Sequence, residues 1–251
     1  FQAEDGIRDT SVTGVQTCAL PIYIGLFTCS EAIGADVSDV FNLLTGFSRQ
    51  RVYRKLTVAP SGMRERVLQL IERETAHAKA GQPARILAKM NALVDRETIH
   101  ALYAASAAGV QVELLVRCIC CLRPGLPGTS DRIRVVSVIG RFLEHSRVWC
   151  FHNDGAPEFY LTSADWMPRN FNRRVEVAVP VEDPALHPRL LSLLETSLAD
   201  NRQAWELSAD GAYARRYPGD AAEVATQKLM LKESWGLGTR PRGERPADAF
   251  G

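Results

Sequence analysis

Two pairs of polar residues, each with i, i+2 spacing, stand at the ends of strand-like segments. His145 and Arg147 begin the stretch HSRVWCF, and Ser163 and Asp165 end the stretch EFYLTSAD. Residues two apart in a strand point to the same side, so each pair presents its side chains together. If the two strands are neighbours, four polar groups converge on one spot, where burial is costly unless they are paired or used.

Arginine dominates the charge of the surrounding segment. Residues 117–174 contain nine arginines, no lysine and five acidic residues, a surplus of four positive charges, although the whole chain carries only +1. A guanidinium can bind two phosphate oxygens at once, which an ammonium cannot. A histidine beside such a cluster favours phosphoryl chemistry, in which the imidazole moves a proton at a bridging oxygen and the arginines hold the charge.

Each of these residues also has a purely structural interpretation. A histidine at a strand end is more often solvated or hydrogen-bonded than catalytic, arginines there are usually surface charge, and Ser163 and Asp165 could cap a turn. Only the clustering favours a site. The other histidines are interpreted as ordinary surface or partly buried residues, and Asn153-Asp154-Gly155 as a hairpin turn.

The elements that position these residues can be predicted from periodicity. Helical spacing is found within 30–46 and 61–81, with Ser61 as N-cap of the second helix. A strand over 84–90, a helix from its cap Asp95 to Gly109 and a strand over 110–116 form a β-α-β unit. Strands and a last amphipathic helix then follow, at 133–139, 147–153, 158–163, 175–181 and 184–200.

Composition limits the class of protein. The chain has 251 residues, 46% of them hydrophobic, which suffices for one good-sized core or two small ones. A charge near zero argues against a general nucleic-acid or membrane-surface binder. No apolar run reaches the roughly 18 residues of a membrane helix. The six cysteines are interpreted as buried reduced thiols, and no metal site is predicted.

Both ends of the chain are set apart. Residues 1–22 lack the basic start and apolar run of a secretory signal, resemble a translated sequencing-adapter read, and are predicted to be a non-native leader on a truncated protein. Residues 236–251 are rich in Gly, Pro and Arg and are predicted to be a disordered tail.

Seven stretches, in order, resemble the C-terminal part of type 1 polyphosphate kinases. The resemblance covers residues 23 to about 235. The stretches are IGADVSDVFNLLTGFS, KLTVAPSGMRERVLQLIERE, ILAKMNALVDRETIHALYAAS, VELLVRCICCLRPGLPG, GRFLEHSRVWCFHNDG, YLTSADWMPRNFNRRVEVAVPV and LADNRQAWEL.

That resemblance implies a fold and an activity. The fold is an α/β, phospholipase D-like mixed sheet flanked by helices, the C-terminal half of a two-half catalytic region. Residues 23–80 are then a helical remnant of the preceding domain, and 81–235 the C-terminal catalytic domain. The activity is reversible transfer of the terminal phosphate of ATP to polyphosphate, with Mg²⁺, through a phosphohistidine. The nucleophilic histidine belongs to the missing half, so the isolated chain is expected to be inactive.

The resemblance also implies partners. They are ATP or ADP, inorganic polyphosphate, the missing N-terminal half of the same protein and, in a homo-oligomer, further copies; nucleic acid is not expected. The protein is expected in the cytoplasm, with peripheral membrane association left open.

The family's motifs give roles to residues of this sequence. His145 matches the second histidine, a general acid or base in contact with the nucleotide, and Arg117 matches the arginine on the nucleotide phosphates. Phe47 stands where the family has the tyrosine that packs on adenine, and it keeps the ring but loses the hydroxyl. Asp165 is a candidate to orient a histidine, with Ser163 in support. Candidates to bind the polymer, from charge and position, are Arg147, Arg141, Lys89, Arg169, Arg173 and Arg174, although Arg174 could simply pair with Glu176. No metal ligand is assigned.

Two rival functions stay open. A phospholipase D-like phosphodiesterase or nuclease would carry an HxK motif followed by a GSxN segment, whereas this chain has HSR and TSAD. A non-catalytic module that binds polyphosphate or other anions would be consistent with the missing nucleophile.

Overall fold

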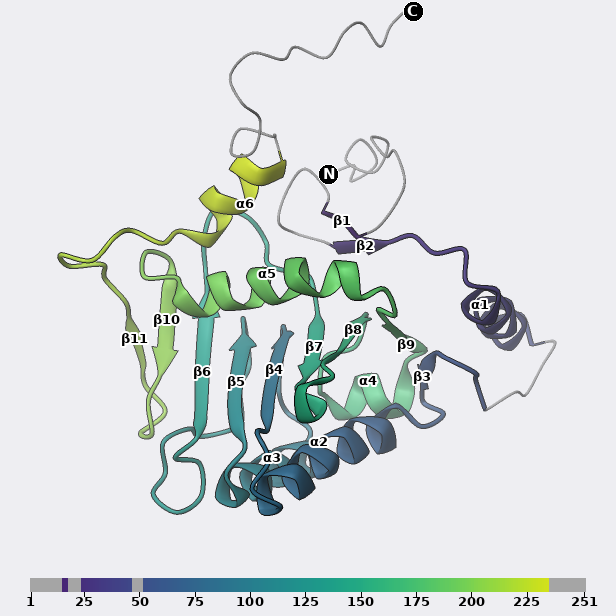
Figure 1. The fold of residues 1–251 in the computed structure, drawn as a ribbon, viewed down its shortest axis with the longest axis horizontal. Coiled ribbons are helices and arrows are strands. Elements are labelled where there is room, and N and C mark those ends of the chain that lie inside the picture. Colours follow the sequence, from purple (N-terminus) through teal and green to yellow (C-terminus); the bar gives the residue numbers. More distant parts are fainter. Residues whose placement is uncertain (1–14, 18–23, 47–51, 235–251) are drawn as a thin grey trace, which may run out of the picture.

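The protein is built around one mixed β-sheet. The computed structural model describes residues 15–17, 24–46 and 52–234. Nine strands lie in the order β11-β10-β6-β5-β4-β7-β8-β9-β3 (Figure 1). In chain order they are β3 Thr57–Ala59, β4 Arg85–Met90, β5 Gln111–Val116, β6 Ile133–Val138, β7 Val148–Phe151, β8 Glu158–Thr162, β9 Glu176–Pro180, β10 Ala204–Leu207 and β11 Tyr213–Arg215. The central β4, β5 and β6 are parallel, and every other pairing is antiparallel.

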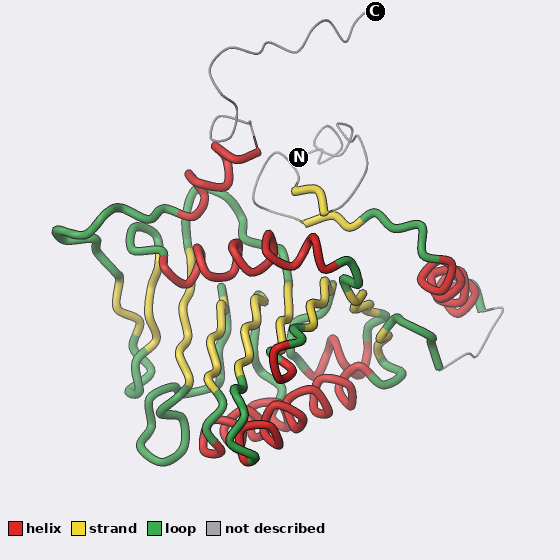
Figure 2. Tube along the Cα trace, in the orientation of Figure 1, coloured by secondary structure: helices red, strands yellow, loops and turns green. Residues whose placement is uncertain are grey.

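Helices cover both faces of this sheet (Figure 2). On one face, α2 (Met63–Lys79) and α3 (Arg96–Ala108) pack in a cluster with strand residues such as Ile86 and Val112. On the other, α5 (His187–Ala199) packs on the alternate strand residues, among them Leu87 and Leu115. The alternation follows from the period of two in a strand. Both faces of the central strands are therefore buried, as expected for parallel strands.

Further helical and strand segments lie around this core. The short helix α4 (Pro168–Arg173) joins β8 to β9, and α6 (Thr226–Ser234) follows β11. To one side of the sheet lies α1 (Glu31–Leu44), and β1 (Val15–Thr17) pairs with β2 (Ile24–Leu26) (Figure 1). Single-turn 3₁₀ helices cover Asn153–Gly155 and Pro184–Leu186.

The predicted fold class, a mixed α/β sheet flanked by helices, is confirmed. The β-α-β unit is β4-α3-β5, with Asp95 accepting a hydrogen bond from the Thr98 backbone N–H and Gly109 ending the helix at φ 110°. The prediction of Ser61 as N-cap of α2 is wrong. Gly62 caps that helix at φ 116°, a left-handed conformation that favours glycine, with no side-chain cap bond.

The boundary expected at residues 80/81 does not coincide with a break in packing. On its N-terminal side, β3 pairs with β9, and α2 contributes to the same core cluster as the central strands. Within the predicted leader, residues 15–17 form a strand paired with residues 24–26. The predicted tail at 236–251 lies outside the described residues. Among the helices of the described ranges, none combines the length and apolar character needed to cross a membrane.

Strand direction brings distant parts of the chain to one edge of the sheet. Because β7 runs antiparallel to β4, the start of β7 lies beside the end of β4, with Val148 opposite Lys89. The end of β8 lies there as well, since Val148 is also opposite Leu161. The start of β9 meets the end of β8 in turn. The residues just beyond these strand ends therefore share one edge, which is where the predicted site residues stand.

Candidate functional site

His145 and Arg147 lie in contact on the loop before β7. An Nη1 hydrogen of Arg147 is donated to the backbone oxygen of His145 at 3.0 Å, and Nη1 lies 3.2 Å from Nδ1 of the imidazole. A guanidinium has no acceptor, so in this contact Nδ1 is the acceptor. In the neutral ring the hydrogen is then on Nε2, which can donate a hydrogen bond to a phosphate oxygen.

Asp165 holds the arginine from its other side. Its Oδ1 accepts from Nε of Arg147 at 2.8 Å and its Oδ2 from Nη2 at 3.3 Å. Oδ1 also accepts from the backbone N–H of Asn91 at 2.7 Å, which ties the carboxylate to the end of β4. Both carboxylate oxygens thus bind the guanidinium, so Asp165 acts on His145 through Arg147. The expected role of Asp165 in orienting a histidine stays a prediction, with Arg147 as the group that connects the two residues.

The surroundings of His145 favour its neutral form. Burial lowers the pKa of the imidazole below 6.5, and the positive charges of Arg147, Arg117 and, more weakly, Lys89 lower it further, while Asp165 acts in the opposite direction. A bound anion would offset the three cations and raise this pKa again. Binding of an anion here would therefore favour protonation of the ring.

A cavity opens beside this contact. It has a volume of about 510 Å³, and its lining includes His145, Arg147, Ser163, Arg174 and Glu176. These residues come from the loop before β7, the end of β8 and the start of β9. The predicted convergence of the two i, i+2 pairs is thus found for His145, Arg147 and Ser163, whereas Asp165 lies behind the guanidinium.

Glu176 organises the far wall of the cavity. Its carboxylate is buried and accepts hydrogen bonds from Ser163 Oγ and Asn170 Nδ2, each at 2.5 Å. Arg174 forms an ion pair with it at 3.7 Å and keeps 55% of its own side chain exposed. The predicted pairing of Arg174 with Glu176 is confirmed, and it leaves the guanidinium accessible from the cavity.

Arg117 lies at the end of β5. Its Nε donates to Oδ1 of Asn91 at 3.1 Å. Together with Arg141 it lines a second cavity of about 350 Å³, which also has Ile139 and Leu143 in its walls. Arg117 and Arg147 are thus both tied to Asn91, through its side-chain oxygen in one case and through Asp165 in the other.

The position of Lys89 does not fit its predicted role as a residue that binds the polymer. The side chain is buried, with 5% of its surface exposed. Its Nζ lies 3.1 Å from Oε2 of Glu144 and donates to Oγ and the backbone oxygen of Ser146 at 2.8 and 3.2 Å. Burial lowers its pKa, and Glu144 counteracts this. A lysine enclosed in this way braces the loop from inside and cannot line an open channel for a polymer.

The remaining predicted residues divide between cavity and surface. Arg169 and Arg173 are exposed on α4, and the residues that line the His145 cavity include Arg174 but neither of these two. Phe47 lies outside the described residues. Asn153 and Asp154 both have positive φ in the turn between β7 and β8, which confirms the predicted hairpin turn.

Two residues of the site were missed by sequence reasoning. Asn91 directly follows β4, and applying the strand-end argument to the segment RILAKM would have found it. Glu176 was considered only as a partner of Arg174, because its bonds to Ser163 and Asn170 depend on how α4 folds back.

The interpretation of the cysteines as buried is wrong for three of them. Cys29, Cys118 and Cys121 are exposed, Cys120 is partly buried, and Cys150 is buried. Cys118 and Cys121 have CxxC spacing. Within the described ranges, however, no three His, Cys, Asp or Glu residues gather as a metal site would require.

Comparison with known proteins gives a consistent result. The family model "Polyphosphate kinase C-terminal domain 2" matches residues 56–227. Proteins named polyphosphate kinase from Thermosynechococcus vestitus and Synechocystis are each 58% identical, over 217 and 216 residues. Each alignment covers 86% of this chain and 30% of the relative, so the chain spans less than a third of their length.

One solved structure agrees closely with the sequence matches. The crystal structure of polyphosphate kinase from Porphyromonas gingivalis aligns with a TM-score of 0.82 at 39% identity, over 86% of this chain and 34% of that one. A phospholipase D family member, Nuc from Salmonella typhimurium, aligns with a TM-score of 0.43 at 17% identity. Because the family model covers well over half of the residues and its members are this similar, the chain belongs to the polyphosphate kinase family.

Proposed function

We propose that the full-length protein is a polyphosphate kinase, which transfers the terminal phosphate of ATP reversibly to polyphosphate, and that this chain supplies the half of the active site that contains His145. The nucleophilic histidine would come from the remainder of the protein. In the first step its nitrogen forms a bond to the terminal phosphorus while the bond to the bridging oxygen of ADP breaks. In the second, a terminal oxygen of polyphosphate displaces the histidine.

The observation that carries this proposal is the cluster around His145. The imidazole is in contact with Arg147, which Asp165 holds with both oxygens, and the same cavity includes Arg174. Two guanidinium groups and a proton-transferring ring that line one cavity match the needs of a phosphoryl group, whose transition state spreads negative charge over its oxygens.

The role of His145 follows from its electrostatics. Its lowered pKa keeps the ring neutral in the free site, with Nε2–H available as a donor. When phosphate enters, its negative charge raises the pKa and favours the imidazolium, which can give its Nε2 proton to the phosphate oxygen that leaves. The imidazolium carries a hydrogen on Nδ1 as well, so in this state Nδ1 no longer accepts from Arg147. His145 therefore acts as a general acid in the direction that releases a phosphate oxygen, and as a base in reverse.

Arg117 and Arg174 would bind substrate phosphates on either side of this histidine. Arg117 is half-buried and tied to Asn91, which suits a fixed contact with the nucleotide phosphates. Arg174 is more exposed and suits the mobile polymer. Arg141, Arg169 and Arg173 are exposed candidates for weaker contacts with polyphosphate, and Phe47 is the candidate for the adenine.

The family resemblance also implies Mg²⁺, which would neutralise phosphate charge when bound. The described part of the chain gathers no ligand set for the ion. The steps assigned to these residues therefore involve only proton transfer and the binding of phosphate charge. A homo-oligomer stays a prediction.

The direct test is His145→Ala in the full-length protein. Turnover in polymer synthesis from ATP should fall about 10²-fold or more, the usual scale for a general acid–base group. His100→Ala, an exposed position on α3, serves as the matched control and should keep full turnover. If His145→Ala retained normal turnover, the assigned role would be lost.

Activity assays on the unsubstituted full-length protein separate the rival functions. A module that only binds anions would show no polymer synthesis even in the unsubstituted protein, while retaining polyphosphate affinity. A phosphodiesterase would instead hydrolyse a phosphodiester such as bis(p-nitrophenyl) phosphate. The isolated 251-residue chain should form no phosphohistidine from ATP, and detection of one would refute the assignment of the nucleophile to the rest of the protein.

A further inference from the structure

The loop that carries His145 and Arg147 has no regular secondary structure between the end of β6 and the start of β7. Its side chains nevertheless alternate. Glu144 and Ser146 are each only 6% exposed, whereas Leu143 is 46% exposed and His145 faces the cavity. Backbone bonds with Gln203 and Thr162 hold only the two ends of the loop, at Ile139 and Arg147. Other partners must hold the residues between them.

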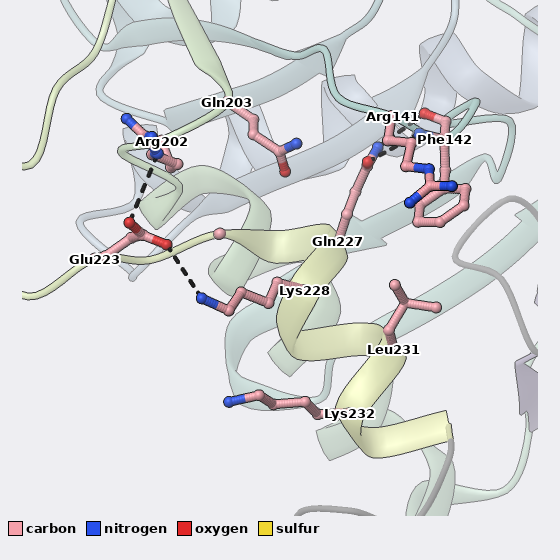
Figure 3. A pocket seen from close by; sticks show the side chains of 10 residues that line it. Arg141, Phe142, Arg202, Gln203, Glu223, Gln227, Lys228, Leu231 and Lys232 are labelled. Carbon is pink, nitrogen blue, oxygen red and sulfur yellow. Dashed lines mark hydrogen bonds and ion pairs between the residues drawn. The ribbon is translucent and has the colours of Figure 1, made fainter.

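Gln227, in the first turn of α6, supplies these bonds. Its Oε1 accepts from the backbone N–H of Phe142 at 3.0 Å, and its Nε2 donates to the backbone oxygen of Phe142 at 2.8 Å. Nε2 also donates to Oε1 of Glu144 at 3.0 Å. Figure 3 shows the Gln227 side chain extending from α6 toward Phe142. The carboxamide thus binds Phe142 as an adjacent strand would.

The contact continues to the site through buried polar groups. Glu144, held by Gln227, pairs with Lys89, and Lys89 donates to both oxygens of Ser146. Ser146 stands between His145 and Arg147 in sequence. Gln227, Glu144 and Lys89 are only 2–6% exposed. Buried charges are costly unless fully paired, so this network is stable in one arrangement of the loop and costly in others.

The start of α6 is itself held firmly. Oδ2 of Asp200 accepts from the backbone N–H of Thr226 at 2.7 Å, and Thr226 Oγ1 donates to the backbone oxygen of Thr196 at 3.2 Å. Asp200 is fully buried. The loop also packs closely against Gln227 at Gly140. A Cβ at this position would lie 2.3 Å from both Oε1 of Gln227 and Nε2 of Gln203.

We propose that Gln227 is a positioning residue for the phosphotransfer site, so that the first turn of α6 holds residues 140–146 in the conformation that sets His145 against Arg147. The kinetic part of this inference rests on the proposed function. The order of the loop does not, and it can be measured separately. The charged groups that face His145 are Arg147, Arg117, Asp165 and Lys89, and the last of them is held through Gln227 and Glu144.

The first test measures the loop itself. Hydrogen exchange followed by mass spectrometry compares the full-length protein with Gln227→Met, which keeps the size and removes the three hydrogen bonds. Peptides that span residues 139–147 should exchange at least tenfold faster, while peptides of β5 should not change. Lys232→Ala, an exposed substitution on the same helix, should match the unsubstituted protein. Unchanged exchange of the loop, or faster exchange of the whole sheet, would overturn the proposal.

The second test measures the consequence for chemistry. Displacement of a catalytic group by about 1 Å can cost about 10²-fold in rate, so turnover of Gln227→Met should fall roughly 10- to 100-fold. Gln227→Glu keeps the acceptor but puts a second carboxylate against Glu144. Its turnover relative to the unsubstituted protein should therefore rise as the pH falls and the new carboxylate takes up a proton, a pattern that general loss of stability would not produce.

The proposed function and the positioning role of Gln227 would be refuted by different results. If the unsubstituted protein made no polymer, the proposed function would fail and the exchange measurement would still decide the role of Gln227. If His145→Ala abolished turnover but Gln227→Met left both the loop and the rate unchanged, the function would stand and the positioning role would be refuted. Gly140→Ala, which displaces the same carboxamide, provides a second variant with the same expected result.

Discussion

The carboxylate of Asp165 binds the guanidinium of Arg147 with both oxygens, at 2.8 and 3.3 Å, and so holds a fixed positive charge 3.2 Å from Nδ1 of His145. These two residues are 18 positions apart in the chain, on the loop before β7 and just after β8. After burial, the charge of Arg147 is the largest cause of the lowered pKa of His145, and this leads to the first prediction.

Arg147→Met should raise the pKa of His145 toward 6.5. Burial is the largest cause of its lowered pKa and remains, but the next largest, the charge of Arg147, is removed. The ring then takes up a proton at a higher pH than in the unsubstituted protein. The measurement is the titration of the imidazole ring protons by NMR, or the acid limb of kcat/KM. Asp165→Asn provides the opposite control, because Asp165 raises the pKa and its loss should lower it. Shifts of the same sign in both variants would contradict this account.

His145 should also make stability depend on pH. Its pKa in the folded protein lies below the ordinary value of 6.5, so the unfolded chain binds more protons in that interval. The folded state is therefore destabilised as the pH falls from 6.5 through the lowered pKa, and this part of the dependence is absent at neutral pH. Urea unfolding of His145→Asn should lack it. An unchanged slope below pH 6.5 would show that the folded pKa is not depressed.

The buried pair of Lys89 and Glu144 should behave as a coupled unit. Lys89→Met leaves a buried carboxylate without its cation and should destabilise the protein by about 3–5 kcal/mol. Adding Glu144→Met should restore a large part of this, less about 1–3 kcal/mol for the Gln227 donor that loses its acceptor. Denaturant unfolding measures the free energy of unfolding of the unsubstituted protein, of Lys89→Met and of the double variant.

The matched control for Lys89→Met is a substitution in the exposed pair of Lys228 and Glu223. These residues lie 3.6 Å apart, with 67% and 44% of their side chains accessible. Lys228→Met should cost no more than about 1 kcal/mol. Equal effects at the two lysines would mean that Lys89 is not enclosed as described.

Arg174→Ala should weaken polyphosphate binding more than nucleotide binding. The guanidinium is accessible from the His145 cavity and only loosely paired, so its loss should raise the KM for polyphosphate roughly threefold to tenfold, equivalent to about 0.7–1.4 kcal/mol. Steady-state kinetics with each substrate varied in turn would measure it. Arg173→Ala is the neighbouring control, with a smaller expected effect. A larger change in the KM for ATP than for polyphosphate would contradict the assignment.

Much of the architecture could be predicted because it depends on short-range rules. Asp95 and Gly109 bound α3 through contacts within one helical turn, and a run of apolar residues identified β5 as a strand buried on both faces. The i, i+2 spacing of His145 and Arg147 likewise predicted their contact. Each of these patterns lies within a few residues of the chain, where periodicity and capping are decided.

What only the tertiary structure decided is the partner of each buried polar group. Lys89 is predicted from the sequence to bind polyphosphate, because its sequence neighbours do not reveal Glu144, which lies 55 positions away. Asp165 is predicted from the sequence to orient a histidine, but its contacts with the Asn91 N–H at the end of β4 and with Arg147 have no local sequence signal. Gln227 gave no signal at all, since its bonds to Phe142 cross 85 positions. A polar side chain is satisfied by whichever groups the strand ends bring within 3 Å, and that depends on strand order and direction, which local sequence patterns do not encode.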